Sequence, residues 1–470
     1  MPISPARAAA FDTLLRVEKT AAYASEMLHS AQSAKLSAAD HGLLTELVMG
    51  VLRWRSVLDE TIAHRVQKPH TNREPEGPLL AKPARNGGLP SDTTSPLTTL
   101  ARLDLEVLTG LRLGAYQLLF LDRVPGHAAV NESVELVKRA RKRSAAGLVN
   151  AVLRKITVAD FARDSAAAHP QWMLERWERN YGAEITRNIC DYDQATPEIA
   201  VRILQPAKTG KPKAAAGSST GELPPERVQL APGRLLTHAA IARAGDITQT
   251  AAYRERQWII QDEGSQLVAL LAGQGEKILD CCAAPGGKTR ILAEKNPHAE
   301  IVALELHPHR AALLRKLVPA ANVRVVAADV RAIPLRLQFD CVLVDAPCTG
   351  TGTLARNPEI KWRLGPEDIN RLQTYQIEIL NSAMQMVATG GRLVYSTCSL
   401  EPEENEAVIE QALTAAFHVV DCRQELLRLQ AQGELAWKDV DSLTRGPYLR
   451  TIPGVQPCDG FFAAILNRRG

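Results

Sequence analysis

The sequence predicts two structural classes in one chain: an all-α N-terminal domain, followed by an α/β, Rossmann-like domain with a mostly parallel, seven-stranded sheet. Apolar residues recur at helical spacing through residues 5–65 and again from Arg102 to about Ile156. After about residue 266, short β-rich runs alternate with helical segments, which is the pattern of a doubly wound sheet. A length of 470 residues leaves room for two or three domains.

The composition is typical of a soluble globular protein, with 45% hydrophobic and 23% charged residues. No window approaches the roughly 18 consecutive apolar residues of a membrane span. Residues 1–20 show no cationic start followed by an apolar run, so we predict no secretory signal. The eight cysteines include no C-x-x-C pair, which predicts neither a metal site nor a disulfide scaffold. We therefore expect a cytoplasmic monomer with reduced thiols.

The helical region spans residues 1–160, and we expect Ser37 and Asp40 to cap its third segment. Residues 66–99 interrupt it and are rich in Pro, Gly, Thr and charge, which predicts a disordered insertion.

A small mixed α/β subdomain is expected over residues 161–265, in which residues 207–226 have the composition of a flexible loop. Trp172, Trp177 and Tyr181 share one amphipathic helix there, where we expect core packing rather than base stacking.

Positive charge is concentrated in the first third of the chain. The net charge is +4, and residues 1–160 hold 21 Lys and Arg against 16 Asp and Glu. Five of six consecutive residues on an expected helix are basic, with Val130, Val134 and Val137 behind them. This cluster predicts contacts to RNA phosphates, although a solvated helix end would have the same composition. Its basic residues are Lys138, Arg139, Arg141, Lys142 and Arg143.

Residues 266–470 form the predicted α/β domain. The expected strands are 277–282, 300–306, 323–329, 339–346, 392–397, 418–421 and 461–466. Helices are expected near 288–295, 308–318, 367–388 and 403–416. In such sheets ligands bind beyond the carboxyl ends of the strands, so residues at those ends are candidates for function.

The first strand runs into a glycine-containing turn, from Asp280 to Thr289, where a ligand can approach the backbone closely. A P-loop would require glycine at position 282, which is a cysteine here, and G-x-G-x-x-G is absent from this turn. The residues of the turn that we predict to hold a cofactor are Cys282, Ala283, Ala284, Pro285, Gly286, Gly287 and Lys288.

Acidic residues end the next three predicted strands: Glu305, Asp329 and Asp345. Such a set suits the ribose and adenine of a nucleoside, whereas it would repel phosphates. S-adenosyl-L-methionine has a ribose, an adenine and no phosphate, and it is therefore the predicted cofactor.

Two cysteines follow adjacent predicted strands in polar, turn-forming contexts: Cys348 in Asp-Ala-Pro-Cys and Cys398 in Ser-Thr-Cys-Ser. Buried thiols are ordinarily packing residues, an interpretation that suits Cys190, Cys341 and Cys422. A thiolate adding to C6 of a cytosine would make C5 electron-rich enough to accept a methyl group. Asp345 would support protonation at N3, for which it needs a raised pKa.

The motifs Cys-Ala-Ala-Pro-Gly-Gly-Lys, Asp-Ala-Pro-Cys, Thr-Cys-Ser and Arg-Asn-Pro-Glu-Ile-Lys-Trp (356–362) occur together. In them the chain resembles the RNA cytosine-5 methyltransferases of the NOL1/NOP2/Sun family, RsmB (Sun/Fmu) type, which act on bacterial 16S ribosomal RNA. The resemblance implies a class I methyltransferase domain over the catalytic half. The helical third is similar, more loosely, to the NusB-type RNA-binding domain that precedes it in that subgroup.

The resemblance also implies roles for individual residues. Cys398 would be the nucleophile, Cys348 would assist product release, and Lys288 would lie near the target base. Glu305 stands where an aspartate is common in the family. Residues 261–265 replace a run that is often smaller and more apolar, so no role is predicted there.

Two other functions remain open on the sequence alone. A DNA cytosine-5 methyltransferase would use the same chemistry with Cys348 of Pro347-Cys348 as nucleophile, but the second cysteine and the lack of a large C-terminal recognition region argue against it. A non-catalytic ribosome-assembly factor could retain the fold, but it would not need Cys398, Cys348 and Asp345 together.

Overall fold

The computed structural model describes residues 3–20, 22–28, 30, 33–66, 100–158, 163–204 and 228–470. The chain divides into two compact units, Met1–Gln171 with Asn357–Glu359, and Trp172–Arg356 with Ile360–Gly470. The insertion predicted at 66–99 lies outside the described residues except for Val66, and the loop predicted at 207–226 lies wholly outside them.

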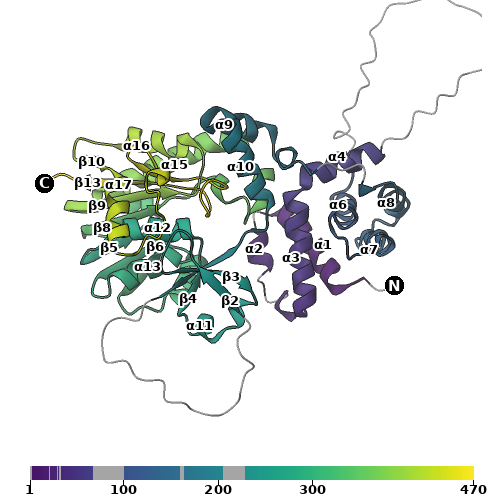
Figure 1. The fold of residues 1–470 in the computed structure, drawn as a ribbon, viewed down its shortest axis with the longest axis horizontal. Helices are drawn as coiled ribbons and strands as arrows, with labels where there is room; N and C mark the ends of the chain where they lie inside the picture. Colours follow the sequence, from purple (N-terminus) through teal and green to yellow (C-terminus); the bar gives the residue numbers. More distant parts are fainter. Residues whose placement is uncertain are drawn as a thin grey trace, which may run out of the picture. The chain divides into compact units, whose positions relative to one another are not determined.

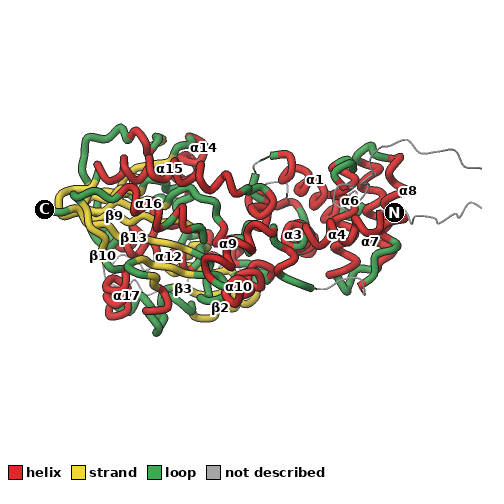
Figure 2. Tube along the Cα trace, turned by 90° about the horizontal axis from the view of Figure 1, so that it is seen from above, coloured by secondary structure: helices red, strands yellow, loops and turns green. Residues whose placement is uncertain are grey.

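The first unit is helical, and Figure 2 shows it in red and green, the colours of helices and loops. Ser37 caps α3 as predicted, accepting a hydrogen bond from the amide of Asp40. Tyr116 packs against Gly50, where a Cβ would lie 2.0 Å from the tyrosine ring. The helices are α1 (Pro5–Lys19), α2 (Ala24–Leu28), α3 (Ala38–Arg53), α4 (Arg55–Val66), α6 (Leu105–Phe120), α7 (Gly126–Arg139) and α8 (Ala146–Leu153). Among the described residues, no helix combines the length and hydropathy that a membrane crossing requires.

The second unit begins with two helices and a small antiparallel sheet of strand order β2-β3-β1-β4. Trp177 is fully buried, as the prediction of core packing requires, and Trp172 and Tyr181 are half-buried. The elements are α9 (Gln171–Tyr181), α10 (Ala183–Gln194), β1 (Ile199–Ile203), β2 (Gln229–Pro232), β3 (Ala239–Ala244), α11 (Ala251–Arg254) and β4 (Trp258–Ile260).

The large sheet has nine strands among the described residues, in the order β11-β12-β13-β9-β8-β5-β6-β7, with β10 also paired to β13. Strands β7, β6, β5, β8 and β9 are parallel, and β13 joins β9 in antiparallel orientation. The strands are β5 (Lys277–Asp280), β6 (Glu300–Glu305), β7 (Val323–Ala327), β8 (Phe339–Asp345), β9 (Val387–Thr397), β10 (Phe417–Val420), β11 (Thr444–Arg445), β12 (Tyr448–Thr451) and β13 (Phe461–Arg468).

The seven predicted strands correspond to β5–β10 and β13. The prediction missed two strands, β11 and β12. They have only two and four residues and show no sustained alternation of polar and apolar residues. The predicted third strand was also too long, because β7 ends at Ala327, two residues before Asp329.

Helices cover both faces of this sheet (Figure 1), as the doubly wound prediction requires. On one face, Leu279, Val342 and Leu393 pack with α15 and α16; on the other, Ile278, Leu343 and Val394 pack with α12, α13 and α17. The helices are α12 (Glu263–Leu271), α13 (Gly287–Lys295), α14 (Pro308–Leu317), α15 (Pro366–Gln385), α16 (Glu406–Ala412) and α17 (Cys422–Ala431). Strand β5 pairs with both β6 and β8, so the strand order reverses there, the position at which such sheets bind ligands.

Candidate active site

The turn between β5 and α13 forms the wall of a pocket of about 130 Å³. Gly286 has a φ of 114°, and a Cβ there would lie 2.5 Å from Val318. A Cβ on Gly287 would lie 3.0 Å from Gln261. Only glycine permits this close backbone approach. The lining residues are Ile260, Gln261, Ser265, Asp280, Cys282, Ala283, Ala284, Pro285, Gly286, Gly287, Lys288 and Asp345.

Asp280, at the start of this turn, is almost completely buried. Its carboxylate accepts a hydrogen bond of 2.7 Å from the Thr289 hydroxyl. Burial raises the pKa of Asp280 to about 7, although the Thr289 hydrogen bond opposes the shift. The β5–α13 turn is thereby tied at both ends by one buried side chain.

Asp345 ends β8 and pairs with Lys288 across the pocket. The Lys288 ammonium donates to one carboxylate oxygen at 2.7 Å, and the Ser396 hydroxyl donates to the other at 3.0 Å. Lys288 also lies 5.3 Å from the centre of the Phe461 ring. The predicted residues Lys288 and Asp345 therefore form one ion pair. The Asp345 carboxylate accepts the hydrogen bonds from both Lys288 and Ser396.

The two predicted cysteines meet beyond the ends of β8 and β9. Their sulfur atoms are 3.4 Å apart, although the residues are 50 positions apart in sequence. The hydrogen bond to Cys398, together with burial, raises the pKa of the Cys348 thiol well above its usual value.

Glu305 and Asp329 do not line this pocket. Glu305 is buried at the end of β6 and accepts from the amide of His307 at 2.9 Å. Asp329 begins a 3₁₀ turn and is paired with Arg331 at 2.7 Å, which lowers the pKa of its carboxyl group. Of the three predicted acids, only Asp345 lies with the glycine turn in the pocket wall.

Four pocket residues were not predicted: Asp280, at the end of β5, and Ile260, Gln261 and Ser265, which precede or begin α12. The last three lie together on one side of the pocket lining. Gln261 donates to the Ser265 hydroxyl at 2.9 Å, and its own amide oxygen is buried without a partner among the described residues. These residues connect β4 of the small sheet to α12, so the small sheet contributes one wall of the pocket. One feature of the sequence could have indicated these residues: the run 261–265 is polar where the family is often more apolar.

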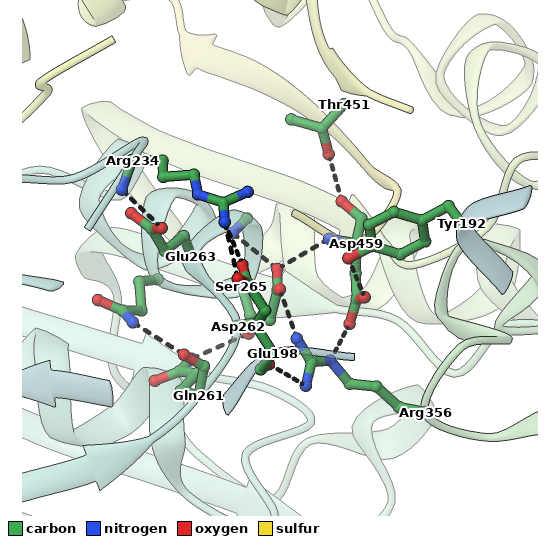
Figure 3. A network of polar contacts seen from close by, with 12 residues as sticks. Tyr192, Glu198, Arg234, Gln261, Asp262, Glu263, Ser265, Arg356, Thr451 and Asp459 are labelled. Carbon is green, nitrogen blue, oxygen red and sulfur yellow. Dashed lines mark hydrogen bonds and ion pairs between the residues drawn. The ribbon is translucent and has the colours of Figure 1, made fainter. Parts of the chain in front are cut away.

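Buried ionic contacts fix that wall (Figure 3). Arg356 lies between two carboxylates, at 3.0 Å from Asp262 and 2.7 Å from Asp459. Tyr192 donates to Asp459 at 3.2 Å. Asp262 caps α12 and follows Gln261 of the pocket wall directly in sequence. Arg356 is the first residue of the Arg-Asn-Pro-Glu-Ile-Lys-Trp motif, and its ion pair with Asp262 therefore connects this motif to the pocket wall.

The basic cluster of the helical unit is arranged differently from the prediction. Only Lys138 and Arg139 belong to α7, because Arg141 has a φ of 63° and the amide of Lys142 bonds back to the Val137 carbonyl, which ends the helix. Three members form ion pairs: Lys138 with Glu135, Arg139 with Asp12, and Lys142 with Asp104. Lys138, Arg139 and Arg143 line a cavity of about 510 Å³ with Ile3 and Glu135.

The remaining predictions concern packing thiols and metals. Cys190, Cys341 and Cys422 are buried, as expected of packing residues. Within the described part of the chain, no group of three or more His, Cys, Asp or Glu side chains is arranged to hold a metal ion.

The chemistry of the pocket lining suits S-adenosylmethionine. Its glycine turn leaves backbone space for a nucleoside, and Asp280 and Asp345 complement a sulfonium or ammonium cation. The orphaned amide oxygen of Gln261 offers a further acceptor at the wall.

Known proteins and family models match both parts of the chain. Residues 267–467 match the model of the 16S rRNA methyltransferase RsmB/F family, and residues 4–76 and 93–158 match the NusB family. A probable ribosomal RNA small subunit methyltransferase B from Bacillus subtilis is 31% identical over 98% of each chain. A ribosomal RNA small subunit methyltransferase B from Vibrio cholerae is 30% identical, over 98% of this chain and 97% of its own. The fold matches the crystal structure of PH0851 over 100% of both chains, with 22% identity and a TM-score of 0.72.

Full-length similarity, the two family models and the fold lead to one assignment. The chain belongs to the RsmB/F family of S-adenosylmethionine-dependent 16S rRNA methyltransferases, with an N-terminal NusB-family domain.

Proposed function

We propose that the protein methylates carbon 5 of a cytosine in 16S ribosomal RNA, through a covalent bond between Cys398 and C6 of the base. The observation that carries this proposal is the 3.4 Å separation of the Cys348 and Cys398 sulfurs. They follow the ends of β8 and β9, and the end of β8 also carries Asp345 of the Lys288–Asp345 pair. The ribosomal substrate is supported by relatives named ribosomal RNA small subunit methyltransferase B.

The reaction begins with the Cys398 thiolate. Its sulfur lies 3.4 Å from that of Cys348, within reach of a hydrogen bond between the two side chains. Addition of the sulfur to C6 breaks the C5–C6 double bond and moves electron density to C5. The Lys288–Asp345 pair supports protonation at N3, where negative charge would otherwise accumulate.

The glycine turn would hold S-adenosylmethionine, whose sulfonium would supply an electrophilic methyl group to C5 and leave as S-adenosylhomocysteine. Product release then requires loss of the C5 proton to water and cleavage of the C6–sulfur bond. The bonding electrons return to Cys398 as a thiolate, which the Cys348 thiol stabilises by the same hydrogen bond. Cys348 therefore assists release rather than attack.

Tritium release tests the carbon that reacts. With 16S rRNA carrying [5-³H]cytidine, methylation at C5 must release one tritium to water for each methyl group transferred. Bisulfite sequencing of 16S rRNA and transfer RNA from a deletion strain would locate the nucleotide. Methyl transfer without tritium release would reject C5, and loss of 5-methylcytosine only from transfer RNA would reject the ribosomal substrate.

A further inference from the structure

One buried carboxylate, that of Glu404, lies next to the cysteine pair without a role in the mechanism above. It ends the 3₁₀ turn Pro402–Glu404 that follows the Thr-Cys-Ser motif, and its side chain is fully buried. A buried carboxylate is costly to desolvate unless several donors surround it. Glu404 has four donors, and they come from three separate segments of the chain.

These donors belong to the two loops that carry the cysteines. Thr349, which follows Cys348, donates to Glu404 from its amide at 2.9 Å and also from its hydroxyl. Ser399, which follows Cys398, donates through its hydroxyl, and the two hydroxyl oxygens lie 3.1 Å apart. The same carboxylate therefore holds the residue after each cysteine.

A third segment joins the arrangement through Gln376 of α15. Its amide nitrogen donates to Glu404 at 2.9 Å and to the carbonyl of Pro347, the residue before Cys348, at 2.8 Å. The Cys348 loop is thus held on both sides of the cysteine. The Cys398 loop is held in addition by Asn405, whose amide donates to the Ser399 carbonyl at 2.9 Å.

The charge of Glu404 also affects the cysteine pair. Among the described residues, the titratable groups that face Cys348 are Cys398, Glu404 and Tyr395. After the hydrogen bond to Cys398 and burial, the negative charge of Glu404 further raises the pKa of Cys348. Tyr395 donates to the Glu404 carbonyl at 2.7 Å, so all of these groups belong to one buried network.

We propose that Glu404 is a positioning residue for the methyl transfer, which fixes the two cysteine loops in a single arrangement. This inference rests on the proposed function, because it assigns Glu404 to the cysteine cycle. It predicts that loss of the charge slows methyl transfer and makes the Cys348 thiol easier to ionise, and that cofactor binding is unaffected.

The test replaces Glu404 by glutamine, which keeps the side-chain size and removes the charge. We expect kcat for methylation to fall at least tenfold in Glu404→Gln, with the KM for S-adenosylmethionine within twofold of the wild type. Glu403→Gln is the matched control, because Glu403 lies in the same turn and pairs with Arg176 instead of the cysteine loops. The control should keep wild-type kcat.

A second measurement needs neither RNA nor turnover. The rate of Cys348 alkylation by iodoacetamide is followed against pH by peptide mass spectrometry, in a Cys398→Ala background with and without Glu404→Gln. Removing a nearby negative charge favours the thiolate, so the Cys348 profile should move to lower pH in the double variant. An unshifted profile, or a Glu404→Gln enzyme with the kcat of Glu403→Gln, would overturn the inference.

If Glu404→Gln fails to fold, Thr349→Val and Ser399→Ala each remove a single hydroxyl donor from Glu404. We expect each to lower kcat while the fold and the cofactor affinity are retained, and wild-type kcat in both would overturn the inference. Failure of the proposed function is distinguishable, because then the wild type itself would release no tritium from [5-³H]cytidine, whatever residue stands at position 404.

Discussion

Two regions show opposite relations between sequence and space: the strand ends that carry Cys348 and Cys398, and the basic end of α7. Cys348 and Cys398 are far apart in sequence, yet their sulfurs lie 3.4 Å apart. The basic cluster is continuous in sequence, yet its members turn to separate partners, Lys138 to Glu135 and Lys142 to Asp104. Parallel strands bring their carboxyl ends to one edge, whereas a helix end distributes neighbouring side chains around its axis. A motif is therefore a stronger guide to a shared site at strand ends than at a helix end.

Apart from loss of the nucleophile itself, the largest effect should come from substitution of Asp345. We expect Asp345→Asn to lower the methylation rate by about a hundredfold or more, because the Lys288 pair then loses its carboxylate. Single-turnover methylation of 16S rRNA measures the rate. Asp340→Asn is the control, since Asp340 lies on the same strand and, among the described residues, accepts hydrogen bonds only from the amides of Glu276 and Lys277. Equal rates in the two variants would remove Asp345 from the chemistry.

A smaller loss is expected at the two acids outside the pocket wall. Removing one charge-assisted hydrogen bond to the cofactor costs about 2 kcal/mol, so Glu305→Ala and Asp329→Ala should each weaken S-adenosylmethionine binding more than tenfold. Isothermal titration calorimetry gives the affinities, with Glu300→Ala, at the exposed start of β6, as control. Unchanged affinity in both variants would restrict the cofactor site to the pocket wall around Asp345.

The basic cluster should show a more modest effect, and an uneven one. Among the described residues, Arg141 and Arg143 have no ion pair, whereas Lys138 and Lys142 do. Each phosphate contact contributes about 1 to the slope of log affinity against log salt. We expect Arg141→Gln with Arg143→Gln to flatten the slope of rRNA binding by about 2, and Lys138→Gln with Lys142→Gln to flatten it less. No change in slope for either pair would indicate a solvated helix end.

The smallest effect is a pH dependence of stability at Asp280. Its pKa is raised to about 7 in the folded protein by burial, so the unfolded chain loses this proton at lower pH than the folded chain. Wild-type stability should therefore fall relative to Asp280→Asn as the pH rises from about 4 to 7, with a constant difference above that range. Urea unfolding at pH 5 and pH 8 measures the difference. An equal difference at both values would place the pKa of Asp280 outside this range.

The sequence predicted the parts of the site that depend on local chain geometry. The glycine turn, Asp345, Cys348 and Cys398 all follow strands whose composition is recognisable, and the parallel order of β5, β8 and β9 brings them together. The arrangement of β7 shows the limit, because the strand ends before Asp329 and a 3₁₀ turn follows.

The residues that sequence reasoning missed depend on tertiary contacts. Glu404 acquires its donors from loops some 5 to 55 positions away, and no local pattern indicates such a network. Arg356 meets Asp262 and Asp459, which lie about 100 positions away on either side. The end of α7 was missed for a different reason, because Arg141 adopts a positive φ without the glycine that marks such positions.

The most direct test of the central claim is one denaturing gel of Cys398→Ala and Cys348→Ala, each incubated with 16S rRNA with and without S-adenosylmethionine. Without the Cys398 thiolate no bond to C6 can form, so Cys398→Ala should be inactive and form no adduct. Without the Cys348 thiol the bond forms but its cleavage stalls, so Cys348→Ala should accumulate a protein–RNA adduct that requires the cofactor. An adduct found only in Cys398→Ala would make Cys348 the nucleophile and contradict the account. Near-normal methylation in both variants would reduce the pair to packing thiols.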